Sequence, residues 1–210
     1  MELKSSMKKL LLTSNGFTNQ KILHAFKNLV GKELSDIKVL YIPTACRANS
    51  AEALAYISAS KNNLVTHGIT KENITEYNLD SDLSDLSKYN AVYVGGGNTF
   101  YLLHRIKETG FDKKLISAIE NGLTYVGVSA GSIITGPTIE TAGPFDENDI
   151  GITDFRGMNL TDTILIPHYS IHREKIVADF RKSLKHEIIA ITDTQAIFIH
   201  NEKTQIIGEP

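Results

Sequence analysis

The chain has 210 residues, of which 41% are hydrophobic, and 22 Lys and Arg side chains nearly balance 24 Asp and Glu side chains. This length is typical of one globular domain that needs no disulfide or metal to fold. A formal net charge of −2 and a pI of about 6.4 argue against binding to nucleic-acid phosphates. The single Cys46 excludes an internal disulfide and a zinc site built from several cysteines.

The first residues contain no targeting signal. Two lysines precede only three leucines before polar residues resume, which is too short for the apolar core of a signal peptide. Elsewhere no apolar run approaches the roughly 20 residues of a membrane span. We therefore expect a cytoplasmic protein, a monomer or homodimer, that binds neither membrane nor nucleic acid. Met7 is an alternative start, and residues 1–6 would then be a disordered extension.

Short apolar runs alternate with segments of helical period, which predicts repeated βα units. The apolar runs are nearly continuous, as expected for a parallel sheet covered on both faces by helices. We therefore predict an α/β fold. In chain order, the predicted elements of the first part are strand 9–13, helix 19–31, strand 38–42, helix 51–64, strands 74–78 and 91–94, helices 99–109 and 112–121, and strand 123–128.

The second part of the chain begins with residues 136–157, which are rich in Gly, Pro, Asp and Thr and show no period. A long irregular segment inside a compact domain is usually functional. After it we predict a strand at 163–166, a helix at 173–184, and strands joined by tight turns at 188–192, 196–200 and 204–207. The chain contains no repeat or linker, so we expect a single domain over residues 1–210.

The sequence Gly127-Val-Ser129-Ala-Gly131 stands where a predicted buried strand passes into a helix. Small residues around a serine at such a turn allow its hydroxyl to project above the sheet as a nucleophile. The N–H of Ala130 could then stabilise an oxyanion. The alternative is an ordinary strand-to-helix turn with an incidental serine.

Three consecutive glycines, Gly95 to Gly97, follow another predicted strand. Such a run suits a chain that approaches a ligand or another loop closely. Ligands of open α/β sheets bind beyond the carboxyl ends of the strands, so this turn and Ser129 are expected to face one crevice. The glycines could donate to an oxyanion, bind a phosphate or form a simple turn. The Lys and Ser/Thr of a P-loop are absent.

A serine nucleophile requires a nearby base. Of seven histidines, His168 is the best placed because it follows the strand predicted at 163–166. The third member of a triad is harder to choose, since no spacing rule selects one acid from a single sequence. The candidates between serine and histidine are Glu140, Asp146, Glu147, Asp149, Asp154 and Asp162.

These motifs resemble peptidase family S51, the group of dipeptidase E and cyanophycinase. The matching segments are Val94 to Phe100 (VGGGNTF), Gly127 to Thr141 (GVSAGSIITGPTIET), Ile166 to Tyr169 (IPHY) and Arg173 to Ile176 (REKI). Their order and approximate distances agree with the family over about residues 7–208. Taken together the four motifs are specific, whereas singly only the serine segment is.

The resemblance implies a three-layer α/β/α sandwich like that of class I glutamine amidotransferases. Ser129 would be the nucleophile, His168 the general base, and the N–H groups of Gly97 and Ala130 the oxyanion hole. Counting back from His168 makes Asp146 the acid, but the segment between serine and acid is then longer than in dipeptidase E enzymes. Glu140 is the second choice.

The resemblance also implies a substrate. Arg173 would bind the carboxylate of an N-terminal aspartate, and Asn98 is a further candidate for substrate binding. We therefore expect a serine peptidase that hydrolyses Asp-X dipeptides, takes small peptides as its only partners, and requires neither a cofactor nor a metal. The alternatives are a cyanophycinase-like or other short-peptide hydrolase, and a non-catalytic α/β domain that binds a small molecule or nucleotide.

Overall fold

A computed structural model describes residues 8–80, 83, 85–201 and 203–209. The expected N-terminal extension and the choice between Met1 and Met7 lie outside these residues. A seven-stranded sheet has the order β3-β2-β4-β5-β1-β8-β9. Its strands are β1 (Lys9–Thr13), β2 (Val39–Ile42), β3 (Ile74–Glu76), β4 (Ala91–Val94), β5 (Thr124–Val128), β8 (Gln195–His200) and β9 (Lys203–Gly208).

Strands β1 to β5 are parallel to one another, and β8 and β9 add an antiparallel hairpin beside β1. Helices lie in the connections from β1 to β2, from β2 to β3 and from β4 to β5, as is usual between parallel strands. The main helices are α1 (Gln20–Val30), α2 (Ala51–Thr66), α3 (Thr99–Glu108) and α4 (Phe111–Glu120). The predicted α/β class with a mostly parallel sheet is confirmed.

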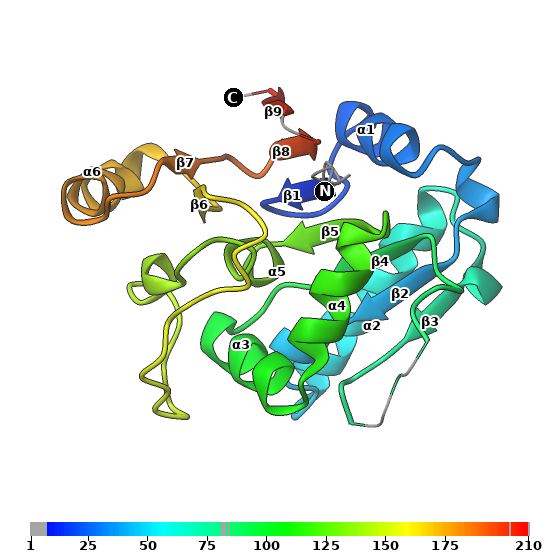
Figure 1. Cartoon of the computed structure of the whole chain (residues 1–210), viewed down its shortest axis with the longest axis horizontal. Helices are drawn as coiled ribbons and strands as arrows, with labels where there is room; N and C mark the ends of the chain where they lie inside the picture. The colour runs from blue at the N-terminus through cyan, green and yellow to red at the C-terminus, as the bar shows by residue number, and fades with distance from the viewer. Residues whose placement is uncertain (1–7, 81–82, 84, 202, 210) are drawn as a thin grey trace, which may run out of the picture.

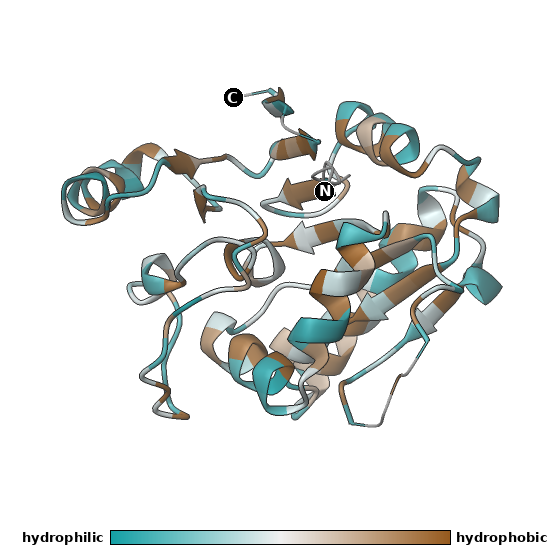
Figure 2. Ribbon diagram, viewed as in Figure 1, coloured by the Kyte–Doolittle hydropathy of each residue, from teal (hydrophilic) through white to brown (hydrophobic). Residues whose placement is uncertain are grey.

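Alternating side chains of the strands supply two apolar cores, one on each face of the sheet. Leu11 and Tyr93 belong to the core under α1 and α2, whereas Leu10 and Val92 belong to the core under α3 and α4. This alternation follows from the two-residue period of a strand. The sheet is therefore the middle of three layers (Figure 1), and apolar side chains concentrate on its strands (Figure 2).

A smaller parallel sheet is formed by β6 (Ile164–Ile166) and β7 (Ile188–Ala190), which α6 (Glu174–Ser183) connects. Ile164, Val177 and Ile188 form a separate buried cluster there. The strand predicted at 188–192 is present as β7, and a turn at Thr192 joins it to β8. The segment around Ile188 pairs with β6, and only β8 and β9 form a hairpin.

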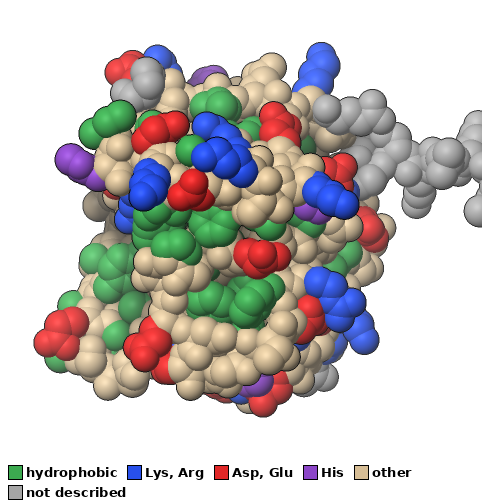
Figure 3. All heavy atoms as spheres, turned by 90° about the vertical axis from the view of Figure 1, so that its left-hand side faces the viewer, with side chains coloured by type: hydrophobic (Ala, Val, Ile, Leu, Met, Phe, Trp, Pro, Cys, Tyr) green, Lys and Arg blue, Asp and Glu red, His purple; other side chains and the backbone are tan. Residues whose placement is uncertain are grey.

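The loops that follow β1, β4 and β5 emerge at the edge of the sheet toward which the arrows of β1 and β5 point, on the left of Figure 1. Figure 3 views the molecule from that side, where hydrophobic patches lie among acidic and basic side chains. Residues 136–157 contain only a short 3₁₀ turn, Glu140–Ala142, and an isolated bridge between Thr138 and Arg156. Within the described part of the chain, no helix is long and apolar enough to cross a membrane.

Candidate active site

Ser129 stands between β5 and the short helix α5 (Ala130–Ile133) with φ 48° and ψ −109°. A positive φ is costly for a residue with a side chain, and such strain persists only where the surroundings hold it. The N–H of Ser129 donates to the carbonyl of Thr13 at 3.0 Å, and the carbonyl of Ser129 accepts the backbone N–H groups of Ser132 and Ile133. The strained serine turn predicted from the sequence is therefore present.

The small residues around Ser129 are required by packing. A β-carbon on Gly131 would collide with the Val94 carbonyl of the neighbouring strand. One on Gly127 would stand 2.7 Å from the backbone nitrogen of Ser132, closer than real contacts allow. The turn is therefore tight enough to bring the start of α5 back against β4 and β5.

The glycine turn after β4 passes beside the serine. A β-carbon on Gly96 would lie 3.3 Å from the Ser129 β-carbon, and one on Gly97, whose φ is 137°, would collide with the Ala45 carbonyl. Asn98 donates its N–H to that same carbonyl at 2.8 Å. Gly96 thus lies beside Ser129, and the N–H of Ala130, the first residue of α5, has no acceptor within its own helix.

His168 reaches the serine from the second sheet. Its Nε2 lies 2.9 Å from Ser129 Oγ, which is hydrogen-bond distance. Its backbone is also in the left-handed region, with φ 56°. Pro167 and His168 directly follow β6, so the expected placement of the histidine beyond a strand end agrees with the geometry.

The acid in contact with His168 is Asp193, whose Oδ1 lies 2.6 Å from His168 Nδ1. This corrects the choice of Asp146, which instead accepts the N–H of Thr99 at 2.8 Å, and of Glu140, which accepts the Thr138 hydroxyl at 3.1 Å. The predicted acids all lie between serine and histidine in the sequence, whereas Asp193 follows both. It lies just after β7, and this position beyond a strand end is the sequence signal that points to it.

A second residue absent from the predicted site, Ser14, joins this contact. Its hydroxyl donates to Asp193 Oδ1 at 2.6 Å and accepts the backbone N–H of His168 at 2.8 Å. Burial by itself raises the pKa of Asp193, but the hydrogen bonds from Ser14 and His168 outweigh it and leave that pKa below its usual value. Asp193 is therefore ionised at neutral pH and acts only as an acceptor.

A cavity of about 230 Å³ opens beside Ser129 and His168. Arg173 lines it, stacked over the ring of Phe145 at 4.1 Å and donating to the Pro167 carbonyl at 3.2 Å. Glu174 does not pair with Arg173 but accepts the Tyr169 hydroxyl. Asp146 lines the same cavity. One cation and one anion therefore face the space next to the serine hydroxyl.

Asn98 has a different environment from the one expected. Its Oδ1 accepts the N–H of Tyr101 at 2.8 Å and caps α3, while its Nδ2 donates to the Glu147 carbonyl at 2.8 Å. The side chain holds two segments of the chain together, and it does not line the cavity beside Ser129.

The acidic loop that contains Asp146 is anchored to the rest of the site. Arg47 pairs with Asp149 through both guanidinium nitrogens and lies over the ring of Tyr101. The Arg47 hydrogen bond holds the pKa of Asp149 below its usual value. Together with the contact of Asn98 to this loop, the pair keeps Asp146 and Phe145 against the cavity.

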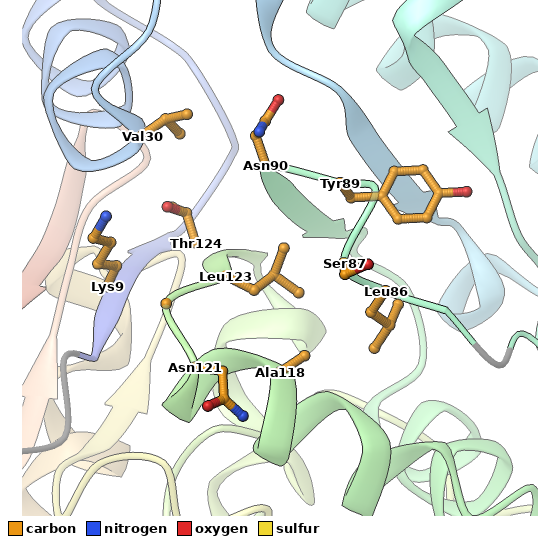
Figure 4. A pocket seen from close by; sticks show the side chains of 11 residues that line it. Lys9, Val30, Leu86, Ser87, Tyr89, Asn90, Ala118, Asn121, Leu123 and Thr124 are labelled. Carbon is orange, nitrogen blue, oxygen red and sulfur yellow. The ribbon is translucent and has the colours of Figure 1, made fainter. Parts of the chain in front are cut away.

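A further cavity, of about 410 Å³, lies at the opposite end of the sheet (Figure 4). Lys9, Asn90 and Thr124 line it at the amino ends of their strands. The ligands of such sheets bind at the carboxyl ends, where Ser129 and His168 lie. Among the described residues, no group of three or more His, Cys, Asp or Glu side chains is arranged to hold a metal ion.

Comparison with known proteins finds relatives that match most of the chain. The family model of peptidase family S51 matches residues 10–207. An uncharacterized peptidase of Listeria innocua, Lin0382, is 35% identical over 91% of this chain and 96% of its own length. Peptidase E of Nostoc sp. is 33% identical over 78% of this chain and 66% of its own length.

Two solved structures resemble the fold. A candidate peptidase E from Listeria monocytogenes EGD-e superposes with a TM-score of 0.81, with 29% identity, and covers 97% of this chain and 100% of its own. A peptidase from an acI-B1 Actinobacterium gives a TM-score of 0.71 with 17% identity, covers 98% of this chain and 89% of its own, and supports the fold alone.

Proposed function

Because the chain belongs to peptidase family S51, and its relatives are peptidases, we propose that it is a serine dipeptidase that hydrolyses Asp-X dipeptides. The observation that carries this proposal is the continuous contact from Ser129 through His168 to Asp193. A serine, a histidine and an ionised acid in that order are the parts of a nucleophile, a base and a group that orients the base.

The reaction follows from the proton positions. Asp193 is ionised and only accepts, so His168 Nδ1 carries a proton toward it and Nε2 is free to accept the proton of Ser129 Oγ. The Ser129 oxygen then attacks the scissile carbonyl, and the N–H groups of Gly97 and Ala130 stabilise the oxyanion. His168 returns the proton to the leaving amine, and water hydrolyses the acyl-enzyme by the same route.

The charges of the cavity support aspartate as the acyl residue. The guanidinium of Arg173 suits a bidentate pair with the aspartyl side chain. Asp146 in the same cavity suits the free α-ammonium group of that residue. A ligand with an ammonium and a carboxylate on one carbon skeleton would pair both, which favours an N-terminal aspartate over an internal one.

The first prediction concerns the nucleophile. Ser129→Ala removes the attacking oxygen, so hydrolysis of Asp-Leu should fall by about 10⁴-fold or more. A panel of Asp-Leu, Ala-Leu and β-Asp-Arg, followed by release of free amino acid, measures both activity and specificity. A fluorophosphonate probe should label wild-type protein at Ser129. Turnover undiminished by Ser129→Ala would rule out the proposal.

The second prediction separates the two aspartates. Asp193→Asn keeps the shape but lets His168 adopt the wrong tautomer, so kcat should fall by about 10³ to 10⁴-fold. Asp146→Asn still accepts from Thr99, so its effect should be mainly a higher KM. Steady-state kinetics on Asp-Leu measure both variants, and a larger loss of kcat in Asp146→Asn would contradict the assignment of Asp193.

The third prediction concerns Arg173. Arg173→Met removes a charged hydrogen-bond donor worth roughly 1.5–3 kcal/mol, so kcat/KM for Asp-Leu should fall about 10- to 100-fold while that for Ala-Leu changes little. Arg181→Met is the matched control, because Arg181 is exposed on α6, the helix that directly follows Arg173, and does not line the cavity. An equal loss for both dipeptides would show that Arg173 does not bind the acidic side chain of the substrate.

A further inference from the structure

A cavity of about 450 Å³, called the second cavity below, borders the core on one face of the sheet, whereas the cavity that Arg173 lines borders the core on the other face. The second cavity opens between α2 and the loop after β1, on the face of the sheet that α1 and α2 cover. The residues that line it include Val128, immediately before Ser129, and Tyr93 of β4. The cavity is therefore built at the same carboxyl edge of the sheet as the serine.

Gly96 lies close to both Tyr56 and Ser129. A β-carbon at this position would lie 3.2 Å from the hydroxyl of Tyr56, which lines the second cavity, and 3.3 Å from the β-carbon of Ser129. The tyrosine hydroxyl and the serine are therefore within the reach of one amino-acid residue. Because position 96 is a glycine, no side chain separates them.

The lining of the second cavity is aromatic and polar but carries no Lys, Arg, Asp or Glu. Phe17 and Tyr93 form a ring pair with centroids 5.6 Å apart. Burial raises the pKa of Tyr56 above its usual value, so its hydroxyl stays neutral. His67 places Nδ1 2.7 Å from the Asn63 carbonyl, a contact in which Nδ1 donates. This surface differs from the charged cavity that holds Arg173 and Asp146.

We propose that the second cavity binds the side chain of the leaving residue X and selects uncharged, apolar or aromatic residues there. The inference rests on the proposed function, in which Arg173 fixes the acyl residue in the cavity that it lines. The leaving residue must then extend toward the other face of the sheet, which the second cavity borders. A carboxylate or ammonium side chain would lose water there, and no Lys, Arg, Asp or Glu lines the cavity to pair with it.

The test compares the leaving residue directly. Wild-type protein should hydrolyse Asp-Leu and Asp-Phe with kcat/KM about tenfold or more above that for Asp-Glu and Asp-Lys, which corresponds to roughly 1.4 kcal/mol. Asn63→Lys places a positive charge at the cavity and should lower the ratio of Asp-Leu to Asp-Glu about fivefold or more. Asn62→Lys is the matched control, because Asn62 is exposed on the same helix outside the lining.

The outcomes distinguish failure of the proposed function from failure of this inference. If wild-type protein cleaves none of the Asp-X dipeptides, both the proposed function and this inference are wrong. If it cleaves all four equally well, or if Asn63→Lys and Asn62→Lys change the ratio alike, the inference alone is wrong.

A different observation carries a second inference, which concerns Ser14. This residue is fully buried directly after β1, and one hydroxyl both donates to Asp193 and accepts from the backbone of His168. A hydroxyl has a single proton to donate. Because Asp193 receives that proton, Ser14 cannot donate to His168 Nδ1, although its oxygen lies 3.2 Å away.

We infer that Ser14 is a positioning residue for the proposed reaction. It holds the strained backbone of His168 and the carboxylate of Asp193 in one arrangement, in which Nδ1 keeps its proton and Nε2 faces Ser129. Its contribution is to alignment, so its loss should affect kcat more than KM.

The experiment compares Ser14→Ala with Ser132→Ala. Ser132 is also fully buried, and its hydroxyl donates to the Thr13 carbonyl at 2.8 Å without touching His168 or Asp193. Ser14→Ala should lower kcat for Asp-Leu about 10- to 100-fold with KM changed less than about twofold, and should shift the downfield NMR resonance of the His168 Nδ1 proton. Ser132→Ala should do neither, although both variants lower the unfolding midpoint.

An unchanged kcat and resonance in Ser14→Ala would overturn this inference, as would equal changes in Ser132→Ala. The NMR measurement does not depend on the substrate, so it would still test the role of Ser14 if Asp-X dipeptides proved to be the wrong substrates.

Discussion

The site depends on the hydrogen bonds that Thr13 makes at the end of β1. Its carbonyl accepts the N–H of Ser129, and its own hydroxyl donates to the Gly127 carbonyl while accepting the N–H of Gly16. These bonds join the ends of two adjacent parallel strands. They hold the strained turn at Ser129 and place Ser14, the next residue, beside it.

A second constraint brings the base and the acid together. The pairing of β6 with β7 continues past both strands, because Ile191 donates to the Ile166 carbonyl and Tyr169 donates to the Ile191 carbonyl. His168 and Asp193 lie in the two loops that this pairing aligns. Their contact is thus fixed by backbone register, and Ser14 connects it to the main sheet. The proposed chemistry needs both sheets, since neither contains all of its groups.

The two cavities near Ser129 differ in charge because Ser129 lies at the edge of the sheet, between the two layers of helices. On the side of α3 and α5, the loop anchored by Arg47 and Asp149 brings Asp146 toward Arg173. On the side of α2, aromatic rings from the core line a cavity that carries no Lys, Arg, Asp or Glu. A peptide bond placed at the serine would therefore meet different chemistry on its two sides.

The amino-acid sequence predicted most of the elements, the α/β class, the turn at Ser129 and the position of His168 at a strand end, because these depend on local period and on glycines that only a tight turn requires. It did not determine Asp193 or Ser14, whose contacts join residues 179 positions apart. Nor did it show that the segment around Ile188 pairs with β6, because an apolar run does not reveal which strand it pairs with. Asn98 and Asp146 were visible as polar residues near the site, yet only the tertiary structure showed that one caps a helix and that the other accepts from the start of that helix. Local patterns predict which groups reach the edge of the sheet, whereas long-range pairing decides which of them touch.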